Sequence, residues 1–496
     1  MNDFQKSDGV VVPKKATNKA ERSAAESVEG RTSAKEHAKE PRSPRTRSRI
    51  SDGTALDRVR EVARKDKNAN FTALLHHVTM ERLRKEYLAM NKDAVPGIDG
   101  TTWKEYGANL EANLKALLDR VHTGAYRALP SRRAYIPKAD GKQRPLGIAA
   151  LEDKLLQRAV AEVMSAIYEE DFLGFSHGFR PGRSQHDALD ALAYGITRKN
   201  VNWVFDADIR GFFDAIDREW LIRFVEHRIG DKRLVSLLHK WLHAGVMEEG
   251  QLTHSETGTA QGSAISPLLA NVYLHYALDL WAQQWRDRHA QGEMIIVRYA
   301  DDFVIGFERY EDGERFWTEL TERLAKFKLE LHPEKTRLIE FGRMAQRNRE
   351  QRGESKPEVF TFLGLTHICG TTRHAKFKLD RHTDRKRLRT KLKANREECM
   401  KRRHESVIEQ GKWLRAVVRG YLNYHAVPTN SSAIRLFRDQ VMCNWRNALM
   451  RRSQRAYVKW DRMKTLQQRW LPAPKIQHPW PDERFALRLQ GRSPVR

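Results

Sequence analysis

Two adjacent aspartates, Asp301 and Asp302, interrupt an otherwise apolar stretch of the chain. The stretch reads MIIVRYADDFVIGF over residues 294–307, and both apolar halves favour β-strands, so we expect a tight hairpin with the two carboxylates at its tip. Adjacent carboxylates raise each other's pKa, a penalty that a divalent cation removes. Such oxygen ligands suit Mg²⁺, which usually binds one or two protein carboxylates together with substrate phosphates. The alternative interpretation is an acidic turn that faces solvent.

A second acidic segment, FDADIRGFFDAID at 205–217, places Asp208 near the end of a run that reads as a buried strand. Burying an unpaired carboxylate costs several kcal/mol, so a cation is expected beside it. One carboxylate from this strand and the hairpin pair could hold two ions about 3.5–4 Å apart, the arrangement that stabilises both the attacking and the leaving oxygen in phosphoryl transfer. Spacing alone does not choose between Asp208 and its neighbours Asp206, Asp214 and Asp217.

The elements that must position these carboxylates are strands and helices in irregular order, which is typical of an α+β fold. Strands are expected at the start of 203–216 and at 360–368, and a hairpin is expected across Asp140-Gly141. Apolar residues recur with helical spacing at 151–169, 266–285 and 314–331. From about residue 380 the chain is helical, very basic and rich in Trp, which predicts a separate all-α domain.

The chain of 496 residues carries 90 Lys and Arg against 64 Asp and Glu, a formal charge of +26. Such an excess repels itself unless a polyanion neutralises it, and nucleic acid is the expected polyanion. No membrane partner is expected, because no basic amphipathic helix and no apolar run of 18 residues occurs. The three cysteines form no CxxC pair and no signal peptide is visible, which argues against a zinc site and predicts a cytoplasmic protein.

Motifs that follow one another over residues 96–365 resemble those of reverse transcriptases. RYADDFVIGF resembles the catalytic hairpin of that family, and DADIRGFFDAID resembles its first carboxylate motif, in which Asp208 matches the metal ligand. The other matching segments are PGIDGTTW, IPKADGKQRPLGI, HGFRPGRSQHDAL, GTAQGSAISPLLANVYL, LHPEKTRLI and FLGL. The resemblance implies a right-hand polymerase, with fingers, a palm built on an antiparallel sheet, and an all-α basic thumb.

The same resemblance implies a role for each matching residue. Two Mg²⁺ ions would be held by Asp208, Asp301 and Asp302. The incoming nucleotide would be contacted by Lys138, Arg144, Phe213, Gln261, Gly262 and Lys335. Among these, Phe213 would exclude a ribose 2′-hydroxyl and Lys335 would act as a general acid toward pyrophosphate; the alternatives are a core aromatic and a surface lysine. The template or another RNA would be bound by Arg180, Arg183, Arg451 and Arg452.

Within the reverse transcriptases, PGIDGTTW and WLRAVVRGYLNYHAVPTN (413–430) resemble the bacterial group II intron-encoded branch. This implies an RNA-directed DNA polymerase and maturase that binds its intron RNA as a ribonucleoprotein and assists splicing and retrohoming into target DNA. Its other partners would be dNTPs and an RNA template with a primer, and it would associate with the nucleoid when acting on DNA. The family's optional HNH endonuclease needs paired cysteines after the thumb, so no nuclease is expected here.

The implied domains are a disordered basic arm (1–60), an N-terminal extension of the fingers (61–135), fingers and palm (136–370), a helical thumb or maturase domain (371–450) and a basic tail (451–496). Two alternatives stay open. One is a free-standing group II-like reverse transcriptase with a host role such as phage defence or DNA repair. The other is a non-catalytic RNA-binding splicing factor.

Overall fold

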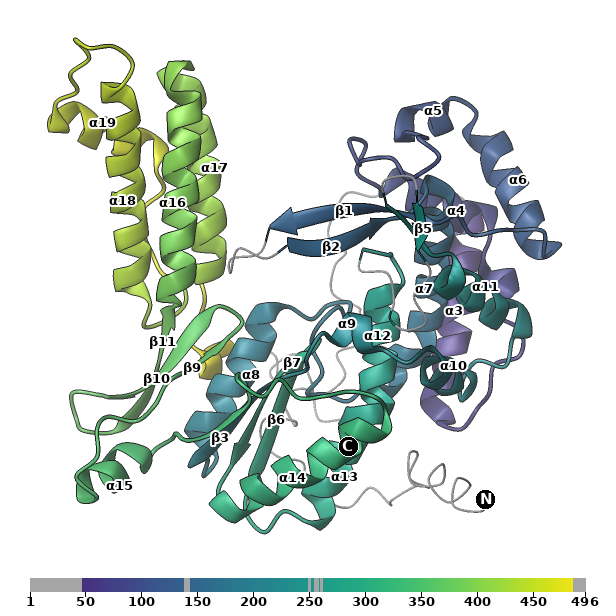
Figure 1. The fold of residues 1–496 in the computed structure, drawn as a ribbon, viewed down its shortest axis with the longest axis horizontal. Coiled ribbons are helices and arrows are strands. Elements are labelled where there is room, and N and C mark those ends of the chain that lie inside the picture. Colours follow the sequence, from purple (N-terminus) through teal and green to yellow (C-terminus); the bar gives the residue numbers. More distant parts are fainter. Residues whose placement is uncertain (1–46, 138–142, 249–250, 254–257, 259–261, 485–496) are drawn as a thin grey trace.

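The computed structural model describes residues 47–137, 143–248, 251–253, 258 and 262–484. Figure 1 shows helices of the N-terminal region on one side, a sheet flanked by helices in the middle, and a helical bundle on the other side. The α+β fold class is therefore confirmed. None of the helices in the described residues is long and apolar enough to cross a membrane.

The N-terminal region consists of short and medium helices that pack around one long helix. These are α3 (Arg47–Lys65), η1 (Leu75–His77), α4 (Met80–Leu88), α5 (Trp103–Ala108), α6 (Leu110–His122) and the long α7 (Leu151–Asp171). The expectation of a disordered arm over residues 1–60 is wrong for its last part, because α3 begins at Arg47. Leu56, Val59 and Ala63 recur at helical spacing and are buried, and α3 packs against α7, so this segment has a core to join.

The predicted hairpin across Asp140-Gly141 is confirmed by its two strands, β1 (Ser131–Pro137) and β2 (Gln143–Ile148), which pair antiparallel. The sheet continues through β4 (Val246–Glu248) and β5 (Gln251–Thr253) in the order β2-β1-β4-β5. In Figure 1 this hairpin extends from the N-terminal region toward the helical bundle.

The central sheet has the strand order β6-β7-β3-β8 and is antiparallel throughout. Its strands are β3 (Trp203–Asp208), β6 (Met294–Tyr299), β7 (Asp302–Phe307) and β8 (Arg337–Glu340). Alternate side chains such as Val204 and Phe205 belong to two different cores, one shared with α8 (Gln185–Arg198) and one shared with α14 (Tyr310–Lys326). Because both faces are buried, β6 and β7 are almost wholly apolar, and the aspartates of the hairpin lie where these strands meet the turn.

Three further helices, α9 (Phe212–Ala215), α10 (Arg218–Glu226) and α11 (Lys232–His243), follow β3. The helix predicted at 266–285 is present but is not regular. It consists of α12 (Ser266–Leu274), a π-helical turn η2 (His275–Asp279) and α13 (Leu280–Arg288).

The segment 360–368, expected to be one strand, contains two strands joined by a turn. β9 (Phe360–Phe362) and β10 (Leu365–Thr371) pair antiparallel, and Leu363 and Gly364 between them take left-handed backbones with φ of 48° and 78°. The run of β-prone residues concealed this turn, which Gly364 allows. β10 then pairs with β11 (Phe377–Thr383), while α15 (Ala345–Gln351) precedes the sheet.

The all-helical bundle begins at Arg385 and not at the expected residue 371, because the β10–β11 hairpin occupies the intervening chain. Its helices are α16 (Arg385–Lys401), η3 (Arg402–His404), α17 (Val407–His425), α18 (Ser431–Met450) and α19 (Trp460–Trp470). Buried Leu414, Phe437 and Trp445 belong to its own core.

Candidate active site

The site lies where two neighbouring strands of the central sheet end. Asp208 is the last residue of β3 and Asp302 the first residue of β7, and the two are direct partners across the antiparallel pair. Directly opposed residues in such a pair have Cα atoms about 4.5–5.5 Å apart. Asp301 precedes Asp302 in the turn, where Ala300 has a left-handed backbone with φ of 57°. The three predicted carboxylates come from two distant segments of the chain and meet at the same end of the two inner strands of the sheet.

Lys335 lies against Asp208, with its Nζ 2.5 Å from the Oδ2 of that aspartate. The backbone produces this contact, because the chain after α14 runs beside the end of β3. The Arg210 N–H donates to the carbonyl of Glu330 at 2.9 Å, and the His332 N–H donates to the carbonyl of Asp208 at 2.8 Å. Lys335 therefore lies beside the predicted catalytic carboxylates, although its side chain remains 60% exposed.

The other three aspartates of this segment have different surroundings. Asp206 accepts a hydrogen bond from the Arg337 guanidinium at 3.2 Å. Asp217 caps the N-terminus of α10 and forms an ion pair with Lys328 at 2.5 Å. Asp214 is exposed on the short helix α9. Of the four candidates that the spacing left open, Asp208 is the one opposite the hairpin pair.

Negative charge is concentrated around Asp302. Partial burial, followed by the charges of Asp301, Asp208 and Asp206, raises the pKa of the Asp302 carboxyl to about 6. Arg387, in the first turn of α16, opposes this rise. A bound cation would relieve the part of this rise that comes from repulsion between the carboxylates, because it would neutralise their charge.

A loop predicted to contact the nucleotide passes between α9 and β2. Phe213 is half-buried, with its ring 5.5 Å from that of Phe212, which is buried in the core. A Cβ at Gly258 would lie 3.0 Å from the Phe213 carbonyl oxygen, and a Cβ at Gly262 would lie 2.7 Å from the Gly147 carbonyl oxygen. Both loop glycines have left-handed φ values, 83° and 107°. Glycine is therefore required for this close approach of three backbones.

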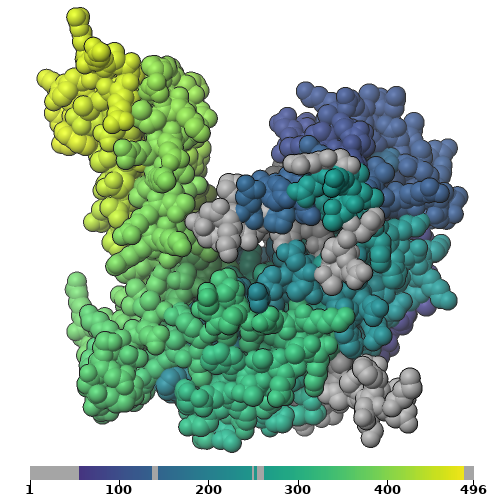
Figure 2. Space-filling model, viewed as in Figure 1, coloured from purple at the N-terminus to yellow at the C-terminus, as the bar shows by residue number. Residues whose placement is uncertain are grey.

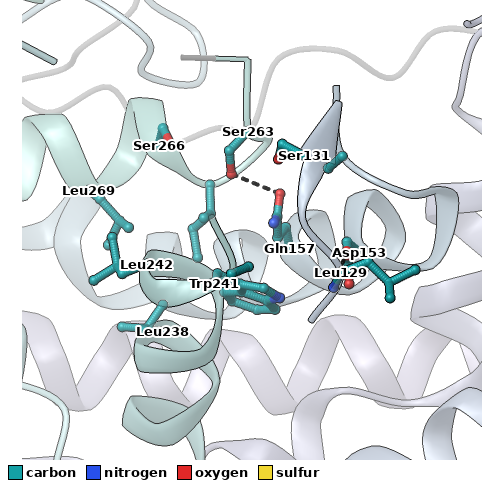
Figure 3. A pocket seen from close by; sticks show the side chains of 13 residues that line it. Leu129, Ser131, Asp153, Gln157, Leu238, Trp241, Leu242, Ser263, Ser266 and Leu269 are labelled. Atoms are coloured by element: carbon teal, nitrogen blue, oxygen red, sulfur yellow. Dashed lines mark hydrogen bonds between the residues drawn. The ribbon is translucent and has the colours of Figure 1, made fainter. Parts of the chain in front are cut away.

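Gln157 of α7 holds the same loop from the other side (Figure 3). Its Oε1 accepts hydrogen bonds from the Ser263 hydroxyl at 2.9 Å and from the Ala264 N–H at 3.0 Å. A cavity of about 20 Å³ beside it, lined by Trp241 among others, has room for roughly one water molecule. Sequence reasoning missed Gln157; the available signal was a glutamine on the apolar face of a predicted helix.

The structure contradicts one predicted RNA contact, Arg180. Its guanidinium is buried and donates to Glu169 at 3.0 Å and to the carbonyls of Leu173 and Ser176 at 2.8 Å each. A guanidinium used in this way inside the fold does not reach template phosphates, so the prediction for Arg180 is wrong. Arg183 in the same loop keeps exposed surface.

The remaining predicted residues are placed less fully. Arg144 lies in β2 next to the hairpin turn, while Lys138 and Gln261 lie outside the described residues. Arg451 and Arg452 follow α18, at the end of the bundle that Figure 1 places farthest from the central sheet. Neither of these two arginines is therefore near the hairpin.

Arg387 is a basic residue of the site that sequence reasoning missed. It lies over the turn between β9 and β10, where a Cβ at Gly364 would be 2.8 Å from its Nη1. Asp384 caps α16 by accepting the Arg387 N–H at 2.7 Å, which fixes the start of the helix beside that turn. The run RKRLR at 385–389 was the available signal, but it does not indicate which arginine faces the site.

Residues 136–367, which include the carboxylates, Lys335 and the loop at Gly262, match the family model described as reverse transcriptase (RNA-dependent DNA polymerase). This part of the chain is therefore similar to reverse transcriptase domains. Protein YkfC of Escherichia coli (strain K12) is 37% identical over 240 residues, which are 42% of this chain and 62% of that protein.

Two other relatives have names that refer to introns. The group II intron-encoded protein LtrA of Lactococcus lactis subsp. cremoris is 42% identical over 168 residues, 33% of this chain and 27% of LtrA. The nuclear intron maturase 3, mitochondrial, of Arabidopsis thaliana is 29% identical over 125 residues, 25% of this chain and 17% of that protein. The chain thus spans less than two thirds of the length of each of these relatives. Over residues 136–367 the chain is thus similar to reverse transcriptases, and the two relatives whose names refer to introns match it over 33% and 25% of its length.

Reverse transcriptase domains use divalent metal ions. Among the residues that the structure describes, no group of three or more His, Cys, Asp or Glu side chains is already arranged to hold one. Instead, the carboxylate of Asp208 faces Lys335. The donor set nevertheless fits a hard cation, because Asp208, Asp301 and Asp302 offer only oxygen ligands. Burial and then the repulsion from the other carboxylates raise the pKa of Asp302, and a cation would relieve the repulsion.

Proposed function

We propose that the chain is an RNA-directed DNA polymerase that extends a primer 3′-hydroxyl with dNTPs on an RNA template. The observation that carries this function is the pairing of Asp208 with Asp302, next to Asp301, within a reverse transcriptase domain. Phosphoryl transfer needs little covalent chemistry from the protein and depends mainly on positioning and on electrostatic stabilisation. Carboxylates gathered at one edge of a rigid sheet supply the positioning.

In this proposal two Mg²⁺ ions are held by Asp208, Asp301 and Asp302. The ions would activate the primer hydroxyl and stabilise the charge of the departing pyrophosphate. Lys335, whose ammonium group already reaches Asp208, would donate a proton to the pyrophosphate. Phe213 would pack under the sugar and exclude a 2′-hydroxyl, a role supported by its half-buried position beside the nucleotide loop.

The remaining nucleotide contacts come from the loop and the β1–β2 hairpin. Gly262 would let the loop backbone approach the base pair, with Gln261 bonding the nucleotide or the template. Lys138 and Arg144, on either side of the hairpin turn, would bind the triphosphate. The position of Arg144 in a strand that contacts the loop at Gly147 supports this assignment.

The same proposal gives the fold a right-hand arrangement. The central sheet would be the palm, the N-terminal helices with the β1–β2 hairpin the fingers, and α16–α19 the thumb. Figure 2 shows a hollow between the helical bundle and the N-terminal region, above the central sheet, that is open to solvent. A primer–template duplex would lie in this hollow, with Arg387 at the junction between palm and thumb.

The proposed second activity is that of a maturase, which binds group II intron RNA and supports its splicing and its insertion into target DNA. The intron-related names of LtrA and the Arabidopsis relative support this, as does the charge of +26. RNA binding would use basic surface such as Arg183, Arg451 and Arg452, because phosphate neutralisation releases counterions.

Primer extension on an RNA template tests the polymerase. We expect wild-type protein to incorporate dNTPs with Mg²⁺ and Asp301→Ala to lose at least about 10²-fold in kcat, as when a group that stabilises transition-state charge is removed. A matched control is Asp461→Ala, whose side chain on α19 is 91% exposed, and which should retain wild-type kcat. Equal inactivity of wild type and Asp301→Ala would instead identify a non-catalytic RNA-binding factor.

Splicing of a group II intron at limiting Mg²⁺ tests the maturase separately. Because this activity needs an RNA-binding surface and no catalytic carboxylate, Asp301→Ala should stimulate splicing as well as wild type does. A chain that extends primers but binds and stimulates no intron RNA would be a free-standing reverse transcriptase. The nucleotide sequence on either side of the reading frame is an independent check, because flanking intron RNA domains would support the maturase and their absence would support the free-standing enzyme.

A further inference from the structure

A fully buried arginine, Arg298 of β6, lies directly below the turn that carries the catalytic aspartates. Its Nε and Nη2 donate to the two carboxylate oxygens of Asp279 at 2.7 and 2.5 Å. The other hydrogen bonds go to Asn271 Oδ1 at 3.1 Å, to Ser176 Oγ at 2.7 Å and to the Ala300 carbonyl oxygen at 2.8 Å. All five N–H donors of a guanidinium are thereby used.

Two of the acceptors, Asn271 and Asp279, reach Arg298 together because of the π-helical turn between α12 and α13. Asn271 and Asp279 are eight positions apart in the chain, whereas two α-helical turns take about 7.2 residues. In a regular α-helix the two side chains would therefore point in different directions. The π-turn at His275–Asp279 accommodates the extra residue, so that both side chains meet the same guanidinium. Such turns are often found at functional sites.

The hydrogen bond to Ala300 is the connection to the turn. Ala300 immediately precedes Asp301 and holds a left-handed backbone with φ of 57°, which is unusual for a residue with a Cβ. Below it, Gly178 is packed so closely that a Cβ would be 2.3 Å from the Ala300 nitrogen. Asn271 also donates to the Gly178 carbonyl at 2.7 Å. The turn is thus supported from beneath by one continuous set of buried polar contacts.

We propose that Arg298 is a positioning residue that holds the Asp301-Asp302 turn in its catalytic conformation through the Ala300 carbonyl, with Asp279 and Asn271 orienting its guanidinium. This rests on the proposed polymerase function. Strained turns persist where the surroundings over-determine them, and catalytic groups need support from neighbouring buried contacts to stay in place. Lysine cannot replace Arg298, because it offers three donors from one point instead of five in a planar fork.

The chain contains a matched control in Arg228, another buried arginine with five hydrogen bonds. It bonds Asp171 twice and the carbonyls of Ala63, Asp66 and Ala69, and so connects α3 to α7 away from the hairpin. The test compares Arg298→Lys with Arg228→Lys in full-length protein. Four quantities are measured: the melting temperature, kcat and KM for dNTP in primer extension, and metal-free hydrogen–deuterium exchange of the amides at 299–303.

A second pair of variants separates positioning from stability. Replacing a buried ion pair by apolar residues of similar size is often neutral for stability, so Arg298→Met combined with Asp279→Leu should melt close to wild type. Arg228→Met combined with Asp171→Leu is its control. If Arg298 only stabilised the fold, the first double variant would recover activity together with its melting temperature.

We expect Arg298→Lys and its double variant to lower kcat roughly 10- to 100-fold, the effect of a misplacement of about 1 Å. KM for dNTP should change less than twofold, and exchange at 299–303 should become faster. The Arg228 variants should leave kcat and this exchange unchanged. Wild-type kcat and exchange in the Arg298 variants, or equal losses in the Arg228 variants, would overturn the proposal. If wild-type protein extends no primer, the polymerase assignment fails, and the exchange measurement still decides whether Arg298 holds the turn.

Discussion

Gly178 offers a direct way to displace the hairpin that carries Asp301 and Asp302. An alanine Cβ there would lie 2.3 Å from the Ala300 nitrogen and 2.9 Å from the Tyr299 carbonyl carbon. Both atoms belong to the backbone, so no side chain can rotate away to make room. Cβ contacts below 3.0 Å are essentially never observed, and the hairpin must therefore move by about 0.7 Å relative to Gly178 to reach even that separation.

Gly178→Ala should lower both the free energy of unfolding and kcat. Overpacking of this kind lowers the free energy of unfolding by about 1–3 kcal/mol. A displacement approaching 1 Å at a reacting group lowers the rate by up to about 10²-fold, so we expect kcat to fall roughly 10- to 100-fold. KM for dNTP should change little, because the nucleotide contacts proposed at Phe213 and Gly262 come from other segments.

The assay is steady-state primer extension on an RNA template, together with the melting temperature of each variant. Gly420→Ala is the matched control, since this glycine lies within α17 and an added Cβ would have no neighbour within 4 Å. Alanine in a helix is more stable than glycine by about 0.5–1 kcal/mol, so the control should melt slightly higher and keep wild-type kcat.

The result that refutes this reasoning is a Gly178→Ala protein that melts lower than wild type but keeps kcat within twofold. The hairpin would then tolerate displacement, and its exact seating would not control the reaction. A normal melting temperature with normal kcat would show that the backbone around Gly178 can relax without cost, which contradicts the close packing itself.

Three further predictions concern selectivity, pH and salt. Phe213→Ala should admit rNTPs in primer extension because the space below the sugar is opened, and unchanged discrimination would remove the gate assignment. The pKa of Asp302 is raised from 3.8 to about 6, so the metal-free protein should lose stability as pH rises through this range, while its affinity for divalent ions increases. Asp302→Asn should abolish this dependence of stability on pH. A wild-type affinity for divalent ions that is independent of pH would contradict the prediction. Affinity for structured RNA should fall steeply with salt, whereas a flat response in a binding titration would mean that the positive charge does not face RNA.

The hairpin that carries Asp301 and Asp302 was predictable because everything that defines it is local. Two β-prone runs with Ala300, Asp301 and Asp302 between them leave few geometries open, and both strands form as expected. The order of short motifs along the chain was equally informative about the family. The net charge of +26, a sum over all residues, needed no structure to indicate a polyanionic partner.

The tertiary structure decided which distant residues meet. The register between β3 and β7 selects Asp208 over its neighbours, the chain after α14 brings Lys335 to it, and packing buries Arg180 where its motif suggested an exposed contact. The sequence pattern indicated for Arg298 only a place in an apolar strand, and its contacts with Asp279 and Ala300 appear only in the structure. These outcomes depend on strand register, helix phase and burial, which arise from contacts between segments far apart in the chain, and local patterns of residue type do not encode such contacts.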